Sequence, residues 1–178
     1  MHPNKIILGT AQFRMKYGLK KNRPKTNREI EEILKYIKQN RFFGIDTSQT
    51  YADTEKILGK KDLKNIKIIS KFIIKENQIT QNTVNKTLKN LKVNSIYAFM
   101  FHDENQILSN KGSFIFDELK GFKKKRIINK IGVSVYNPEK AIEIINKFDI
   151  DIIQIPVSIF DRRFLNQRFI NLINKKNI

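Results

Sequence analysis

The chain has 178 residues, enough for one domain that buries about 70% of the surface of its unfolded chain. It contains no cysteine, which excludes a disulfide framework, a thiolate metal site and a cysteine nucleophile. No apolar stretch approaches the roughly 20 residues that a membrane span needs, and no signal-peptide core follows Met1. We therefore expect a cytoplasmic protein that does not bind membranes.

The formal net charge is +18, with a pI of about 10.0. An excess of this size is typical of proteins that bind nucleic acid or another polyanion. The lysines are scattered, however, and they are not interleaved with aromatic residues. The chain is rich in Lys, Asn and Ile, whose codons are A/T-rich, so base composition explains the charge without a selected partner. We expect salt-sensitive, non-specific anion binding and no specific nucleic-acid partner.

Short apolar runs alternate along the chain with longer stretches that have helical spacing. The runs predict strands at Lys5–Thr10, Phe42–Asp46, Ile66–Lys71, Ile96–His102, Ile131–Ser134 and Ile152–Pro156. Helices are predicted behind the capping box Thr26–Glu29, around Thr54–Leu58, over Val84–Leu91, around Phe114–Lys123, behind Asn137–Glu139 and at Leu165–Lys175. A polar loop is expected between the first strand and the first helix.

Six strand-then-helix units of this kind predict parallel strands joined by right-handed crossovers. Two architectures are compatible with them: a doubly wound open sheet and a (β/α)8 barrel. A nucleotide-binding open sheet usually carries a glycine-rich first turn, and the chain has no G-x-G-x-x-G motif. We therefore favour one domain over residues 1–178, an incomplete (β/α)8 barrel with about six units.

The active sites of such barrels lie at the carboxyl ends of the strands. Asp46, Lys71 and His102 each end a predicted strand, and Tyr51 follows Asp46 by five residues. Each has a structural alternative: a helix cap, a solvated lysine, a structural histidine and loop packing, respectively. Because neighbouring strands lie under about 5 Å apart, their joint placement at one edge favours a shared pocket.

These four side chains suit proton transfer to a carbonyl oxygen. A phenol is a poor acid at neutral pH, and a nearby ammonium lowers its pKa. A buried ammonium in turn needs a carboxylate partner. Asp46 would therefore hold Lys71, Lys71 would tune Tyr51, and Tyr51 would donate the proton, with His102 orienting the carbonyl. No metal site and no nucleophile elbow is predicted.

The chain resembles the aldo-keto reductases along essentially its whole length. The resemblance rests on five motifs in order: Gly44–Tyr51, Ser70–Lys71, Phe101–Asp103, Gly132–Ser134 and Ile153–Pro156. It implies a (β/α)8 barrel that binds NADPH and reduces an aldehyde or ketone to an alcohol. By this resemblance Tyr51 is the general acid, Lys71 and Asp46 are its tuning pair, and His102 orients the substrate.

The resemblance also implies cofactor-binding residues. Ser134 and Gln154 would bind the nicotinamide carboxamide, and Gly9, Thr10 and Ala11 would line the cofactor near the first strand. Two residues depart from the family pattern. Val135 stands where the family most often has Asn, and Arg14 stands where one branch commonly has Gly. Arg14 would either crowd the pocket or contact a phosphate.

The main departure is the number of units, six where the family has eight. The resemblance thus implies a C-terminally truncated member without the loops that grip the cofactor phosphates and choose between NADPH and NADH. An unclosed barrel exposes strand edges, so we expect self-association. Two other interpretations stay open: a catalytically inactive fragment and a basic polyanion-binding protein.

Overall fold

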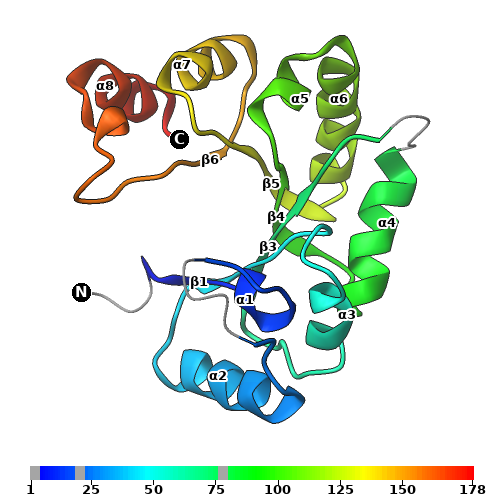
Figure 1. Cartoon of the computed structure of the whole chain (residues 1–178). Helices are drawn as coiled ribbons and strands as arrows, with labels where there is room; N and C mark the ends of the chain where they lie inside the picture. The colour runs from blue at the N-terminus through cyan, green and yellow to red at the C-terminus, as the bar shows by residue number, and fades with distance from the viewer. Residues whose placement is uncertain (1–4, 19–22, 76–79) are drawn as a thin grey trace. The chain divides into compact units, whose positions relative to one another are not determined.

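The structure, a computed structural model, describes residues 5–18, 23–75 and 80–178 (Figure 1). Its elements are β1 (Ile7–Gly9), α1 (Ala11–Arg14), α2 (Asn27–Gln39), β2 (Gly44–Asp46), α3 (Thr54–Leu58), β3 (Lys67–Phe72), α4 (Thr80–Leu91), β4 (Ile96–Phe101), α5 (Glu104–Leu108), α6 (Asn110–Lys124), β5 (Ile128–Ser134), α7 (Pro138–Lys147), β6 (Ile152–Gln154), the 3-10 helix η2 (Arg163–Leu165) and α8 (Gln167–Lys176). The six strands follow one another in a sheet in chain order, as the alternating pattern predicts.

The chain divides into two compact units. The first comprises residues 1–72 and 78–97, and the second comprises residues 73–77 and 98–178. The boundary passes through β4, between Tyr97 and Ala98. No helix in the described part of the chain is long and apolar enough to cross a membrane.

Three strands of the first unit pair in parallel. Gly9 lies opposite Asp46, and Asp46 lies opposite Ile69, so the carboxyl ends of β1, β2 and β3 share one edge. All three residues of β2 are buried, as expected for a strand covered on both faces. In this register Asp46 is level with Ile69, and Lys71 lies two residues farther along β3 toward its carboxyl end.

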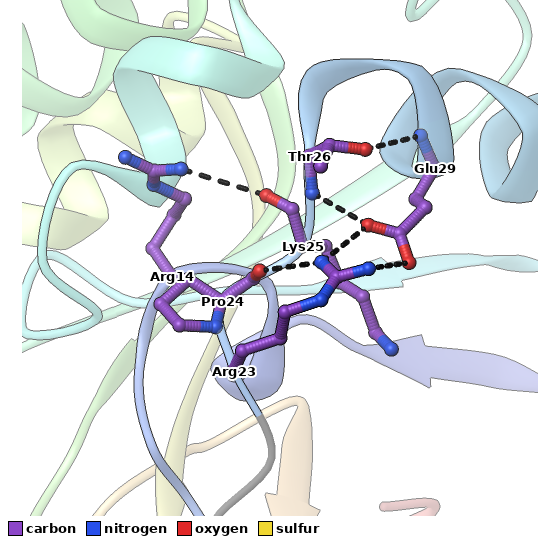
Figure 2. Close-up of polar contacts among 6 residues, drawn as sticks. All are labelled: Arg14, Arg23, Pro24, Lys25, Thr26 and Glu29. Atoms are coloured by element: carbon purple, nitrogen blue, oxygen red, sulfur yellow. Dashed lines mark hydrogen bonds and ion pairs between the residues drawn. The ribbon is translucent and has the colours of Figure 1, made fainter.

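The start of α2 is fastened by the predicted capping box. The Glu29 amide donates to the Thr26 hydroxyl at 3.2 Å, and the Thr26 amide donates to the Glu29 carboxylate at 2.7 Å (Figure 2). The Arg23 guanidinium adds two bonds to the same carboxylate, at 2.9 and 3.0 Å. These donors, Arg23 first and then Thr26, lower the pKa of Glu29 to about 2.

In the second unit β5 and β6 pair in parallel, with Ser134 opposite Gln154. The Asn137 side chain accepts the amide of Lys140, and Pro138 occupies the first turn of α7. The N-cap predicted for this helix is therefore confirmed.

Some boundaries differ from the sequence prediction. The loop expected after β1 contains the short helix α1, and α5 was not predicted. α1 spans four residues and α5 spans five, so each is too short for apolar residues to recur along one helical face; α3 is as short, but it was predicted. β2 begins at Gly44 rather than at Phe42, because the Phe42 amide donates to the carbonyl of Ile37 and still belongs to the end of α2.

Helix α6 supplies a test of the packing. A Cβ added at Gly112 would lie 1.9 Å from the carbonyl oxygen of Gln106, whereas one added at Gly121 would meet nothing within 4 Å. We expect Gly112→Ala to lower the free energy of unfolding by about 1–3 kcal/mol, because α5 must move away. Gly121→Ala, the matched control, should raise it by about 0.5–1 kcal/mol through helix propensity. Urea unfolding measures both, and equal effects would contradict the close approach of α5 and α6.

Candidate active site

The first unit holds a buried ion pair at the ends of β2 and β3. The ammonium of Lys71 donates a hydrogen bond to Oδ1 of Asp46. Lys71 is 1% exposed and Asp46 is 8% exposed. Burial lowers the pKa of the Lys71 ammonium, and the charge and hydrogen bond of Asp46 act in the opposite direction. An ammonium this deeply buried is stabilised by the carboxylate beside it.

The loop from Thr47 to Tyr51 is fastened to the end of β3. The Thr47 amide donates to the Ile69 carbonyl at 2.8 Å. The Gln49 amide and the Ser48 hydroxyl both donate to the Lys71 carbonyl, at 2.9 and 3.1 Å. These bonds bring Tyr51 back over β3, where the Lys71 ammonium lies 5.3 Å from the centre of the Tyr51 ring. The structure therefore brings Asp46, Lys71 and Tyr51 together.

A tight turn leads from Tyr51 into α3. The Tyr51 amide donates to the Ser48 carbonyl at 3.1 Å, and the Thr54 amide donates to the Tyr51 carbonyl at 3.0 Å. Ala52 between them has a φ of 49°, in the left-handed region that non-glycine residues seldom adopt. A residue held in this conformation indicates that its surroundings determine the path of the loop.

A buried polar cluster that the sequence analysis missed supports this loop from α3. Glu55 is 3% exposed and accepts hydrogen bonds from Ser70 at 2.7 Å and from Thr87 at 3.0 Å. Asn90 donates to its second oxygen at 3.1 Å. The signal in the sequence was Ser70, a polar residue that directly follows Ile68 and Ile69 in the strand and whose buried side chain needs a partner.

The three residues expected near the cofactor at β1 have different environments. The amide and the hydroxyl of Thr10 both donate to the Asp46 carbonyl, at 2.9 and 3.0 Å, and Thr10 is fully buried. Thr10 thus holds the backbone of Asp46 in place. A Cβ added at Gly9 would meet nothing within 4 Å, so open space adjoins this end of β1. Ala11 is the half-buried first residue of α1.

Arg14, for which the sequence left two roles open, contacts protein groups. Its Nε donates to the Asp53 carboxylate at 2.9 Å. Its Nη1 approaches the Lys25 carbonyl at 3.5 Å (Figure 2). Arg14 therefore ties α1 to the segment before α2 and to the residue that precedes α3.

The second unit carries His102, Ser134 and Gln154. His102 follows the last residue of β4 and is half-buried. Ser134 is 5% exposed and faces the exposed Gln154 across the β5–β6 pair. Val135, which replaces the usual Asn, is completely buried, and its amide donates to the Gln154 carbonyl at 2.9 Å. A hydroxyl and a carboxamide therefore stand side by side at the ends of β5 and β6.

Comparison with known proteins places this geometry in a family. A model of the aldo/keto reductase family matches residues 5–178. A structure described as an aldo-keto reductase from Pseudomonas aeruginosa is 21% identical, with a TM-score of 0.75 over 94% of this chain and 67% of that chain. The holo form of an aldo-keto reductase from Bacillus halodurans is 17% identical, with a TM-score of 0.78 over 98% of this chain and 59% of that chain.

An aldo-keto reductase from Klebsiella pneumoniae, solved in complex with NADPH, is 15% identical, with a TM-score of 0.69 over 97% of this chain and 60% of that chain. No curated protein matches the sequence. The chain thus spans between 59 and 67% of the length of these three structures. Their likeness confirms the predicted fold, an incomplete (β/α)8 barrel. The match over residues 5–178 shows that the chain belongs to the aldo/keto reductase family.

Proposed function

We propose that this chain carries the proton-transfer half of an NADPH-dependent reductase that converts an aldehyde or ketone to an alcohol. The observation that carries the proposal is the Lys71 ammonium, which is buried against Asp46 and lies 5.3 Å from the centre of the Tyr51 ring. A carbonyl that gains hydride also needs a proton on its oxygen. In this proposal the Tyr51 hydroxyl donates that proton.

The ion pair explains how a phenol acts as an acid near neutral pH. As Tyr51 loses its proton, negative charge develops on the phenol oxygen, and the neighbouring ammonium stabilises it. Little water competes, because Lys71 is 1% exposed, and a charge acts more strongly where water is excluded. Asp46 keeps Lys71 protonated and fixes its position. Asp46 and Lys71 therefore act through Tyr51 as positioning residues.

The described residues suit a nicotinamide cofactor, which would supply the hydride. Ser134 and Gln154 offer a hydroxyl and a carboxamide, groups that pair with a carboxamide through donors and acceptors alike. The open space beside Gly9 leaves room at the end of β1. In this proposal Gly9, Thr10 and Ala11 line the cofactor, and His102 donates a hydrogen bond that orients the carbonyl of the substrate.

A fluorescence titration of NADPH into the purified chain, at moderate salt and with inorganic pyrophosphate as competitor, tests the cofactor assignment. Because the net charge of +18 attracts any anion, pyrophosphate separates recognition of nicotinamide from attraction to phosphate. Saturable binding that persists with pyrophosphate supports the proposal. Binding that disappears with pyrophosphate or with salt contradicts it and favours a non-catalytic fragment.

Removing the phenol oxygen should stop the chemistry. We expect Tyr51→Phe to reduce kcat for a small aldehyde by about 10²–10⁴-fold, the usual contribution of a general acid. NADPH affinity and the unfolding curve should stay close to those of the unaltered chain. Tyr36→Phe removes the same atom from a tyrosine that is 58% exposed on α2 and serves as the control. Equal rates in the two variants would rule Tyr51 out as the acid.

Neutralising the carboxylate should change the pH dependence. In Asp46→Asn the Lys71 ammonium loses the group that favours its charged form, so the pKa of Lys71, already lowered by burial, falls further. Lys71 then loses its proton, and with it the charge beside Tyr51, at a lower pH. The alkaline limb of the kcat/KM profile should move to lower pH. Asp151→Asn removes the partner of the more exposed Lys123 and should leave that limb in place. An unmoved limb in Asp46→Asn would contradict the role of the pair.

A further inference from the structure

The first unit contains a second candidate site, a cavity of about 440 Å³ between the end of α2 and the segment before β3. This volume lies in the range of roughly 300–1,000 Å³ that is typical of small-molecule sites. The cavity is lined by Ile37, Lys38, Arg41, Phe42, Asp62, Lys64, Asn65 and Ile66. Its wall therefore combines an aromatic ring and two isoleucines with a group of charged side chains.

The cavity lies away from the candidate active site. Arg41 and Phe42 precede β2, whereas Asp46 ends it. Lys64 likewise precedes β3, whereas Lys71 lies near its carboxyl end. Because both strands run in the same direction, the two sites lie at opposite ends of the same pair of strands.

The charges of the lining favour an anion. Three cations, Lys38, Arg41 and Lys64, face one carboxylate, Asp62. Lys38 pairs with Asp62 at 2.5 Å, and the Lys64 amide also donates to Asp62 at 2.9 Å. The carboxyl end of α2 contributes roughly half a negative charge, which still leaves the cavity positive.

Among the residues that line the cavity, Arg41 is the best candidate to bind an anionic ligand. Within the described part of the chain its guanidinium has no hydrogen-bond or ion-pair partner. Its φ is 53°, the left-handed conformation that helix ends usually give to glycine. A guanidinium without a partner among the described residues thus lines the cavity, and the backbone at its position would accept glycine without strain.

We propose that this cavity binds a small phosphomonoester with a planar organic part, such as a nucleoside monophosphate, through Arg41. A phosphomonoester carries about −1.5 to −2 charges near pH 7, which matches the excess of two cations over carboxylates in the lining. The guanidinium of Arg41 suits the phosphate because it offers paired donors, and the half-buried Phe42 ring offers a face for a planar base. This inference does not depend on the proposed reductase activity.

Adenosine 5′-monophosphate, titrated calorimetrically at about 0.15 M ionic strength, tests the site. Arg41→Gly removes the guanidinium and places at that position the residue its backbone prefers, so the variant should fold at least as well as the unaltered chain. We expect the Kd to rise about tenfold, the effect of losing a charged hydrogen bond. Lys64→Gln should weaken binding in the same direction.

Helix α4 offers a matched control. Lys92 follows α4, has a φ of 53° and donates its amide to the Lys89 carbonyl, just as the Arg41 amide donates to the Lys38 carbonyl. Lys92→Gly therefore makes the same change of charge and backbone away from the cavity lining. It should change the Kd less than about twofold, because the remaining charges are screened at this salt. If Arg41→Gly and Lys92→Gly weaken the binding of adenosine 5′-monophosphate equally, the change of net charge alone explains the loss. That result would overturn the proposal.

The choice of ligand provides a second check. Cyclic adenosine 3′,5′-monophosphate keeps the base and sugar but carries a diester with a single charge, so it should bind more weakly than the monoester. NADPH binding at the candidate active site should not respond to Arg41→Gly. Equal affinity for the two nucleotides, or no binding of adenosine 5′-monophosphate, would overturn the proposal.

Discussion

The arrangement of the first unit around β2 and β3 depends on one constraint, the free-energy cost of burying the Lys71 ammonium. Lys71 is 1% exposed, and a charge so far from water requires a carboxylate nearby. Asp46 meets this requirement because β2 and β3 pair in parallel with Asp46 opposite Ile69, two residues before Lys71. The Lys71 carbonyl then accepts hydrogen bonds from Ser48 and Gln49. One strand end therefore sets both the charge of the site and the path of the loop that carries Tyr51.

A second buried carboxylate lies beside the same strand. Successive side chains of a strand point to opposite faces, and consecutive residues of β3 each engage an acid. Ser70 donates to Glu55, whereas Lys71 donates to Asp46. Glu55 also accepts from Thr87 on α4, so β3 is connected to polar groups on both of its faces. The end of β3 is thus held in place by the protein's own contacts, as the proposed proton transfer would require.

The sequence predicted the features that repeat or that have a simple chemical requirement. The six strands, the capping box at Thr26 and the convergence of Asp46 with Lys71 follow from periodicity, spacing and the cost of buried charge. The Glu55 cluster did not, because its partners lie 15 to 35 residues from Glu55 and Ser70, the one polar signal among them, does not indicate which acid it contacts. Hydrogen bonds between distant side chains depend on packing, which periodicity does not encode.

Backbone strain by itself does not distinguish a functional residue in this chain. Arg41, Lys92 and Arg126 each follow a helix with a positive φ, and each is followed by an apolar residue whose amide closes the helix end. What separates Arg41 from Lys92 is the surroundings, because Arg41 lines a cavity with an excess of cations and Lys92 does not. Charge and volume therefore distinguish the second site, and the conformation of Arg41 allows a substitution by glycine that tests it.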